Sequence, residues 1–209
     1  ECGITMSDTT KDNCQTFIKE YLNKKDIHTY DTKGNGCTTI KWVCSDKFFL
    51  NYDDVYDENK EKILNNKFIT GNRDKLLQLV KGLLDSDGHV GKEIYFNTTS
   101  KKLAYSMRYI LMLLNIVSSG YILDRIGEVS SYKNITTRKL KYVIRIPKVK
   151  DICEMYNIQH SNKFSFVECE KYFLTRIISI DEEDYKGFVY DLNIEENHNY
   201  LTSSGIVHN

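Results

Sequence analysis

Hydrophobic residues follow two different patterns along this chain. Up to about residue 158, apolar side chains recur at helical spacing in some segments and alternate with polar ones in others, which predicts a mixture of helices and strands. The predicted helices are a segment that a Ser7–Thr10 cap region opens and that continues through Leu22, a short stretch near Glu58–Leu64, and then Arg73–Leu84, Lys101–Leu114 and Val149–Tyr156. The predicted strands are Ile4–Met6, Cys37–Cys44, Ile94–Phe96, 121–126 and 139–147, with a loop at Gly34–Gly36.

The remaining residues contain only short strand-like segments. These are Phe164–Val167, Tyr172–Ile180, Gly187–Ile194, Tyr200–Thr202 and Gly205–Val207. A change from mixed elements to short strands is typical of a boundary between domains. We therefore expect an α+β domain over residues 1–158 and a second, all-β domain over residues 159–209.

The order strand, hydroxyl-rich cap and helix occurs twice in the first domain. When the sequence is shifted by 90 residues, Ile4 aligns with Ile94 and Phe17 with Met107. This alignment predicts an internal duplication. The counterpart of Asp87 would fall before residue 1, so the first copy is expected to be incomplete and to lack its leading helix.

Composition narrows the classes of function. The chain has 29 Lys+Arg and 29 Asp+Glu and a formal net charge of zero, so any surface for nucleic acid must be a local basic patch. No apolar run approaches the roughly 18 residues of a membrane span, and the N-terminus opens no signal peptide, so we expect a soluble, intracellular chain without membrane contact. The six cysteines show no C-x-x-C spacing, which argues against a zinc site and gives no support for a disulfide framework.

Groups suited to proton transfer are concentrated at the end of the chain. The last five residues are Gly205–Asn209, and Asp191 and His198 lie shortly before them. The side-chain amide of an asparagine can attack its own backbone carbonyl and sever whatever follows. The amide is a poor nucleophile and the departing amine a poor leaving group, so neighbouring groups must move protons. Asn209 is therefore the candidate reactive residue, and the proton-transfer groups His208, His198 and Asp191 lie close to it in the sequence.

The spacing of these groups over residues 176–209 resembles the two C-terminal sequence blocks of inteins, which are Hint-fold β domains that excise themselves and join the flanking exteins. The resemblance implies that Asn209 cyclises to a succinimide and releases the C-extein. His208 would polarise the scissile carbonyl or protonate the leaving amine, and His198 would assist as base or hydrogen-bond donor. Asp191 would act earlier, on the N-terminal acyl shift and the branched intermediate. The resemblance implies no cofactor for splicing.

A second motif reads Val80-Lys81-Gly82-Leu83-Leu84-Asp85-Ser86-Asp87-Gly88. It resembles the LAGLIDADG motif of homing endonucleases, which are often embedded in inteins. The resemblance implies an αββαββ fold in which two such helices pack through small residues, here Gly82, and each presents an acid to a divalent metal at the scissile phosphates of double-stranded DNA. Asp87 is the matching acid and metal ligand, while Asp85 takes a less direct position. Lys81 departs from the small or apolar residue that is usual at its place.

The chemistry implied at this motif needs oxygen ligands and a basic neighbour. Carboxylates suit Mg²⁺, which activates water and stabilises the leaving oxygen. Lys41, Lys139 and Lys141 are equal candidates for the basic group. The basic positions Lys139, Lys141 and Arg145 also predict a strand face that binds DNA, although a solvated strand face has the same pattern. One motif provides one acid, whereas cleavage of both strands needs two, so an active endonuclease and a degenerate scaffold both remain open.

Two expected parts of an intein are missing from the sequence. Glu1 is not a nucleophile, and Cys2 is not followed by the early Thr-x-x-His block. We therefore expect the C-terminal portion of a split intein, whose partners are the flanking exteins and an N-terminal fragment that supplies the nucleophile and the second acid. A chain shortened by design would look the same. The alternatives are a free-standing LAGLIDADG DNA-binding protein or endonuclease with a structural β tail, and a self-cleaving Hint-type domain, which is disfavoured because it does not need the terminal His-Asn.

Overall fold

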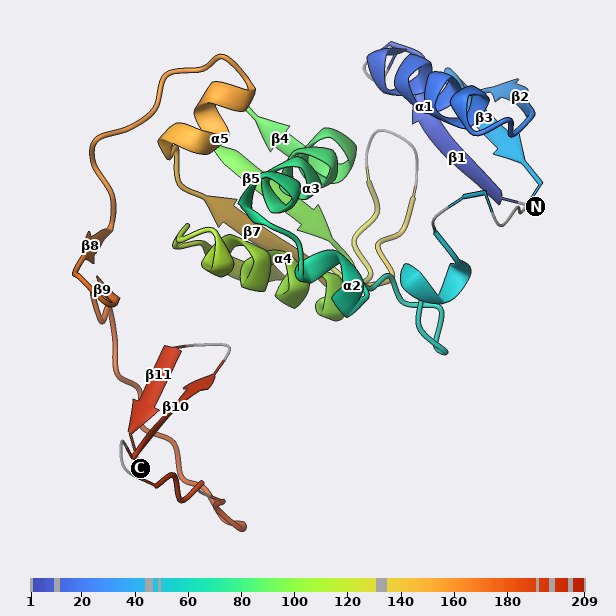
Figure 1. The fold of residues 1–209 in the computed structure, drawn as a ribbon. Helices are drawn as coiled ribbons and strands as arrows, with labels where there is room; N and C mark the ends of the chain where they lie inside the picture. The colour runs from blue at the N-terminus through green and yellow to red at the C-terminus, as the bar shows by residue number, and fades with distance from the viewer. Residues whose placement is uncertain are drawn as a thin grey trace. The chain divides into compact units, whose positions relative to one another are not determined.

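The protein is described by a computed structural model of residues 1–209. The described residues are 2–9, 12–43, 47–48, 50–130, 135–190, 192–195, 198–202 and 205–208. The chain divides into two compact units, Glu1–Gln159 and His160–Asn209 (Figure 1).

The first unit opens with a small repeat of one helix and three strands. Its elements are β1 (Cys2–Ser7), α1 (Asp12–Lys24), β2 (Thr29–Gly34) and β3 (Cys37–Trp42). The strands form an antiparallel sheet in the order β1-β3-β2, and α1 packs on it through a core formed by Leu22, Ile27, Ile40 and Trp42. Strand β2 was not predicted, because its mostly exposed sequence lacks the apolar alternation that marks a half-buried strand. Its pairing with β3 across a tight turn forms the strand instead.

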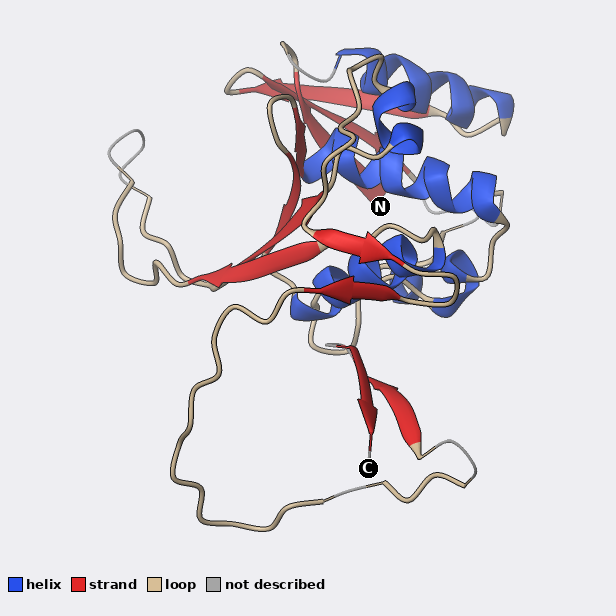
Figure 2. Cartoon of the chain, turned by 90° about the vertical axis from the view of Figure 1, so that its left-hand side faces the viewer, coloured by secondary structure: helices blue, strands red, loops and turns tan. Residues whose placement is uncertain are grey.

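A larger repeat follows the connector that covers residues 51–69. Its elements are α3 (Arg73–Asp87), β4 (Gly88–Val90), β5 (Ile94–Thr98), α4 (Lys101–Leu113), β6 (Ser119–Leu123), β7 (Lys141–Ile146) and α5 (Lys150–Met155). The sheet order is β4-β5-β7-β6, and α3 and α4 cover one of its faces (Figure 2). Helix α4 buries side chains that recur at helical spacing, namely Leu103, Ala104, Met107, Ile110 and Leu111. Among the described residues, no helix has both the length and the apolar character needed to cross a membrane.

The topology repeats in the way that the predicted internal duplication requires. In the first repeat β1, α1, β2 and β3 follow one another as β5, α4, β6 and β7 do in the second, and both sheets place the last strand of the repeat in the middle. The second repeat begins with α3 and β4, and β5 consequently has neighbours on both sides. Within the described residues, β1 pairs only with β3 and is an edge strand.

The connector does not form the helix predicted near Glu58–Leu64. It contains a 3₁₀ turn at Tyr52–Asp54, a tight turn closed by a bridge between Tyr56 and Lys62, and the short helix α2 (Asn66–Ile69). The Asp57 carboxylate accepts hydrogen bonds from the backbone N–H groups of Asn59, at 2.9 Å, and Glu61, at 2.8 Å. Because such aspartate-centred turns satisfy the backbone locally, they compete with a helix, and this competition explains the wrong prediction.

Two glycines of the motif have opposite steric surroundings. A Cβ atom at Gly88 would lie 2.6 Å from the Leu84 carbonyl oxygen and 2.7 Å from the Leu84 Cα, whereas a Cβ at Gly82 would meet nothing within 4 Å. Gly88→Ala is therefore expected to lower the free energy of unfolding by about 1–3 kcal/mol through overpacking. Gly82→Ala, inside α3, is the matched control and should raise it by about 0.5–1 kcal/mol. Urea unfolding followed by circular dichroism measures both, and equal stability of the two variants would contradict this account.

In its described residues, the second unit forms two antiparallel hairpins. They are formed by β8 (Phe166–Glu168) with β9 (Phe173–Thr175) and by β10 (Asn199–Thr202) with β11 (Gly205–His208). The strands predicted over Tyr172–Ile180 beyond Thr175 and over Gly187–Ile194 are not formed in the described residues. A strand needs a neighbour for its backbone hydrogen bonds, and an isolated hairpin is only marginally stable. The apolar pattern is present in these segments, but the part of the chain that the structure describes forms no strand that pairs with them.

Candidate functional site

A pocket of about 400 Å³ opens at the C-terminal end of α3. It is lined by Tyr56, Lys60, Glu61, Lys62, Asp87, Asn97, Thr98, Thr99, Ser100, Lys139 and Lys141. The connector, the end of α3, the junction of β5 with α4, and the start of β7 all contribute to the lining. With four lysines and two carboxylates, the pocket has a formal charge of +2, which favours an anionic ligand.

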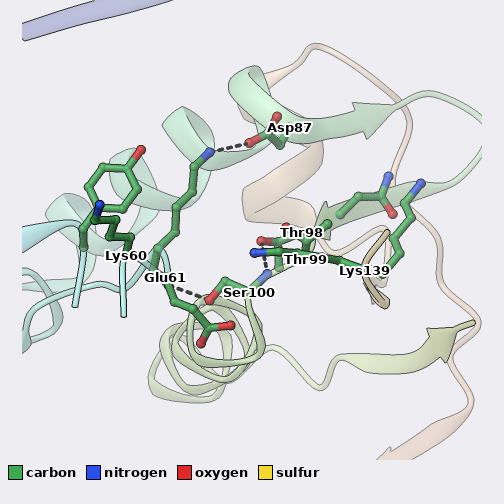
Figure 3. A pocket seen from close by; sticks show the side chains of 11 residues that line it. Lys60, Glu61, Asp87, Thr98, Thr99, Ser100 and Lys139 are labelled. Carbon is green, nitrogen blue, oxygen red and sulfur yellow. Dashed lines mark hydrogen bonds and ion pairs between the residues drawn. The ribbon is translucent and has the colours of Figure 1, made fainter. Parts of the chain in front are cut away.

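Asp87 is the last residue of α3 and contributes the carboxylate that the motif predicted. Its side chain is half exposed, and Oδ2 lies 3.6 Å from the Lys62 ammonium of the connector. Figure 3 shows Asp87 on one side of the pocket and Thr98, Thr99 and Ser100 across from it. The second predicted acid of the motif is placed differently.

Asp85 is bound to neighbouring side chains and does not line the pocket. Its carboxylate accepts hydrogen bonds from Lys81 at 2.6 Å and from the Tyr156 hydroxyl at 2.8 Å. Lys81 also lies 5.1 Å from the centre of the Tyr156 ring. Burial, and then the hydrogen bond to Asp85, raise the pKa of Tyr156 far above its usual value, so the hydroxyl remains a donor. The unusual Lys81 therefore links α3 to the segment after α5.

The pocket floor is formed by the start of α4. Ser100 is the N-cap residue: its hydroxyl oxygen accepts from the Leu103 N–H at 3.1 Å and donates to the Lys62 carbonyl at 2.6 Å. Ser100 is 5% exposed. The same side chain thus caps the N-terminus of α4 and holds the connector beside it.

Two of the three candidate lysines are brought to Asp87. Lys139 and Lys141 line the pocket, whereas Lys41 pairs with Gly3 in the sheet of the first repeat and is not among the lining residues. Arg145 lies outside the pocket on the same face of β7 as Lys141, and its guanidinium stacks 5.4 Å from the Tyr121 ring centre. The motif and the basic alternation thus located one acid and two lysines of this site.

Lys60, Glu61 and Lys62 were missed as site residues. They belong to the connector, which Asp57 and Ser100 attach to α4. Such a long-range attachment has no local signal in the sequence.

The pocket meets the chemical requirements of a Mg²⁺-type ion only in part. Its oxygen donors, from Asp87, Glu61 and neutral hydroxyl and amide groups, are of the kind that hard cations prefer. Within the described residues, however, there is no cluster of three or more acidic, histidine or cysteine side chains that could hold a metal ion. Asp87 thus offers one strong ligand of a site that needs further ones.

The predicted splicing residues belong to the second unit. The register of the last hairpin pairs the backbone of Asn199 with that of His208, so His198 directly precedes this pair. His198 has a left-handed backbone, with φ of 50°. Asp191 and Asn209 lie outside the described residues.

The motif helix and the strands after it resemble a known class of domain. Residues 74–146, from α3 to the end of β7, match the family model of a LAGLIDADG-like domain. In fold, the chain is similar to the homing endonuclease I-DmoI in its complex with DNA and Mn, with a TM-score of 0.50 and 14% identity over 77% of this chain and 81% of that one. At this identity the similarity concerns the fold alone.

Two curated relatives from archaea of the genus Thermococcus are large enzymes. The chain is 29% identical over 152 residues to the ATP-dependent DNA helicase Hel308 of Thermococcus kodakarensis, which covers 66% of this chain. It is 23% identical over 229 residues to a DNA polymerase of Thermococcus hydrothermalis, which covers 99% of this chain. The chain spans only 13% of the length of each of these relatives.

Proposed function

We propose that this chain is the C-terminal portion of an intein that splices in trans with an N-terminal fragment. We further propose that its first unit is an endonuclease domain that acts on double-stranded DNA. The proposal places the chain inside the cell and within a host protein.

The pocket at Asp87 is the observation that carries the DNA part of the proposal. A carboxylate at the end of the motif helix lies in a cavity with four lysines, and Lys141 and Arg145 continue the basic character along β7. Lysine and arginine side chains bind the phosphates of DNA and release its counterions. A divalent ion bound at Asp87 would supply an activated water and stabilise the leaving oxygen. Asp87 would share that ion with a second acid from outside this chain.

The pattern of relatives supports an element inserted into host proteins. A helicase and a DNA polymerase have different activities, yet the same chain resembles a small part of each. A module shared by unrelated enzymes in this way is best explained by insertion. The similarity to the polymerase extends over nearly the whole chain and therefore includes the second unit.

The second unit exposes apolar side chains, which supports our proposal that it is an incomplete β domain. Several of its aliphatic and aromatic side chains between Ile177 and Tyr190 are largely exposed, and Ile178 reaches 93%. Large apolar surfaces of this kind mark sites where another protein segment binds. We assign them to the N-terminal fragment, whose strands would pair with the segments that remain irregular here.

The last hairpin supports the assignment of the splicing residues. Its register brings the backbone of His208 opposite Asn199, next to His198, and Asn209 follows directly in the sequence. In the proposed step, the Asn209 amide nitrogen bonds to its own backbone carbonyl carbon, and the peptide bond to the next residue breaks. The amide proton passes to the leaving amine with the help of His208 and His198. Asp191 acts before this step, on the bond at the other end of the intein.

A trans-splicing experiment tests the proposal. The chain, with a reporter peptide after Asn209, is mixed with the upstream fragment carrying its own N-extein, and the products are identified by mass. Ligated exteins are the expected result. Release of the reporter without ligation would indicate a self-cleaving Hint-type domain. If the reporter stays attached and the chain binds DNA in a separate assay, the result would favour the free-standing DNA-binding protein.

A further inference from the structure

The connector places one lysine beside Asp87 through a defined set of contacts. The backbone of Lys62 is held by the hydrogen bond from Ser100, a buried residue at the start of α4. The Asp57 carboxylate, which closes the connector turn, pairs with Lys102 of α4 at 2.6 Å. The hydrogen bond to Lys102 lowers the pKa of Asp57, so this link persists at neutral pH. Lys62 is therefore fixed at its backbone, while its half-exposed side chain extends into the pocket.

The Lys62 ammonium lies where a cation bound to Asp87 would compete with it. It is 3.6 Å from Asp87 Oδ2, within the distance of a solvent-exposed ion pair. A divalent ion that binds the same carboxylate experiences repulsion from this ammonium. A DNA phosphate that enters the pocket attracts it instead.

We propose that Lys62 is a tethered counter-ion of Asp87, which competes with the divalent metal and transfers to a DNA phosphate when the duplex binds. This inference rests on the proposed role of Asp87 as a metal ligand. It makes metal binding and DNA binding mutually supportive, because DNA removes the lysine from the carboxylate that the metal needs. Lys62 is thus a positioning residue, since it acts on the metal through Asp87.

The inference predicts opposite effects of one substitution on two ligands. Lys62→Met should increase the affinity for Mn²⁺ of the full-length chain combined with the upstream fragment, which supplies the second acid, by about two- to fivefold, as expected for the loss of a partly exposed ion pair. The same variant should bind a generic DNA duplex more weakly and lose about one unit of the salt slope, because one phosphate contact is removed. Electron paramagnetic resonance of free Mn²⁺ and fluorescence anisotropy of labelled DNA measure the two affinities.

Three controls complete the experiment. Lys62→Arg keeps the charge and should behave like the unmodified chain in both assays. Lys60→Met alters a lysine of the same turn for which no ion pair with Asp87 is described, and it should change Mn²⁺ affinity much less. Asp87→Asn should weaken Mn²⁺ binding, and if it does not, the proposed metal role of Asp87 is wrong. If Asp87→Asn weakens Mn²⁺ binding but Lys62→Met leaves it unchanged or reduces both affinities, the counter-ion role of Lys62 is wrong.

Discussion

Asn209→Ala is expected to abolish the release of any residues that follow position 209. Alanine has no side-chain nitrogen, so the five-membered succinimide cannot form and the peptide bond after residue 209 has no intramolecular nucleophile. The measurement is the amount of reporter peptide freed over time from a precursor that has been combined with the upstream fragment. The mass of the remaining chain provides a second reading, because an Asn209 succinimide is lighter than a C-terminal asparagine acid by one water.

The two histidines should have smaller, graded effects in the same assay. His208→Ala removes a proton-transfer group next to the scissile bond and is expected to slow release by about 10²–10⁴-fold. His198→Ala should also slow release, since the hairpin register places His198 beside the His208 backbone pair. His160→Ala is the matched control, because His160 lies at the start of the unit and should leave the rate unchanged. Release from Asn209→Ala at the rate of the unmodified chain would rule out the cyclisation.

The assay also separates the two ends of the splicing reaction. Asp191→Asn is expected to reduce ligation more than release, because its implied role belongs to the N-terminal acyl shift. Both ligation and release require the upstream fragment if the second unit folds only when its exposed apolar residues pack against that fragment. Release by the chain alone, without the fragment, would show that the second unit folds independently.

The first unit could be predicted from the sequence to the extent that local patterns determine it. The helix Arg73–Asp87 carries an apolar stripe and an asparagine cap, and α4 carries a serine cap and a wide apolar face. The duplication was visible because β1 and β5 precede their helices in the same order. The duplication is harder to follow after α4. In the first repeat a tight turn at Gly36 joins β2 to β3, whereas in the second repeat a long connection joins the equivalent strands β6 and β7.

The errors occur where tertiary contacts or missing partners determine the structure. The connector was predicted as a helix, but the Asp57 carboxylate binds its own backbone and Lys102 and holds a turn instead. The irregular segments of the second unit carry a valid strand pattern, yet pattern alone does not provide the neighbouring strand. Lys62 was missed for a related reason, because its position depends on contacts with a helix 38 residues further along the chain.

The two acids of the motif have different partners. Asp85 is bound by Lys81 and Tyr156, while Asp87 faces the basic pocket. Replacing Asp85 should therefore affect the packing between α3 and the segment after α5. Replacing Asp87 should affect the chemistry at the pocket.

Asp87→Asn is accordingly expected to lower metal-dependent DNA cleavage by about 10²–10⁴-fold while DNA binding is retained. The amide has nearly the same shape as the carboxylate but lacks the charge that holds a divalent cation, so the activated water is lost. The remaining lysines of the pocket still bind phosphates, and removal of one negative charge does not weaken that attraction. Cleavage is measured on the uninterrupted form of the host gene, with the upstream fragment and Mg²⁺ present, and binding is measured by anisotropy.

Asp85→Asn is the matched control for this experiment, since it changes the same chemical group two residues away. The substitution weakens the hydrogen bonds to Lys81 and Tyr156 and is expected to cost about 1–3 kcal/mol of stability, seen as a lower urea midpoint. Below that midpoint, its cleavage rate should stay close to that of the unmodified protein. A cleavage defect in Asp85→Asn with normal cleavage by Asp87→Asn would reverse the assignment of the metal acid. Normal DNA binding without cleavage by the unmodified protein would identify the domain as a DNA-binding scaffold that has lost its nuclease activity.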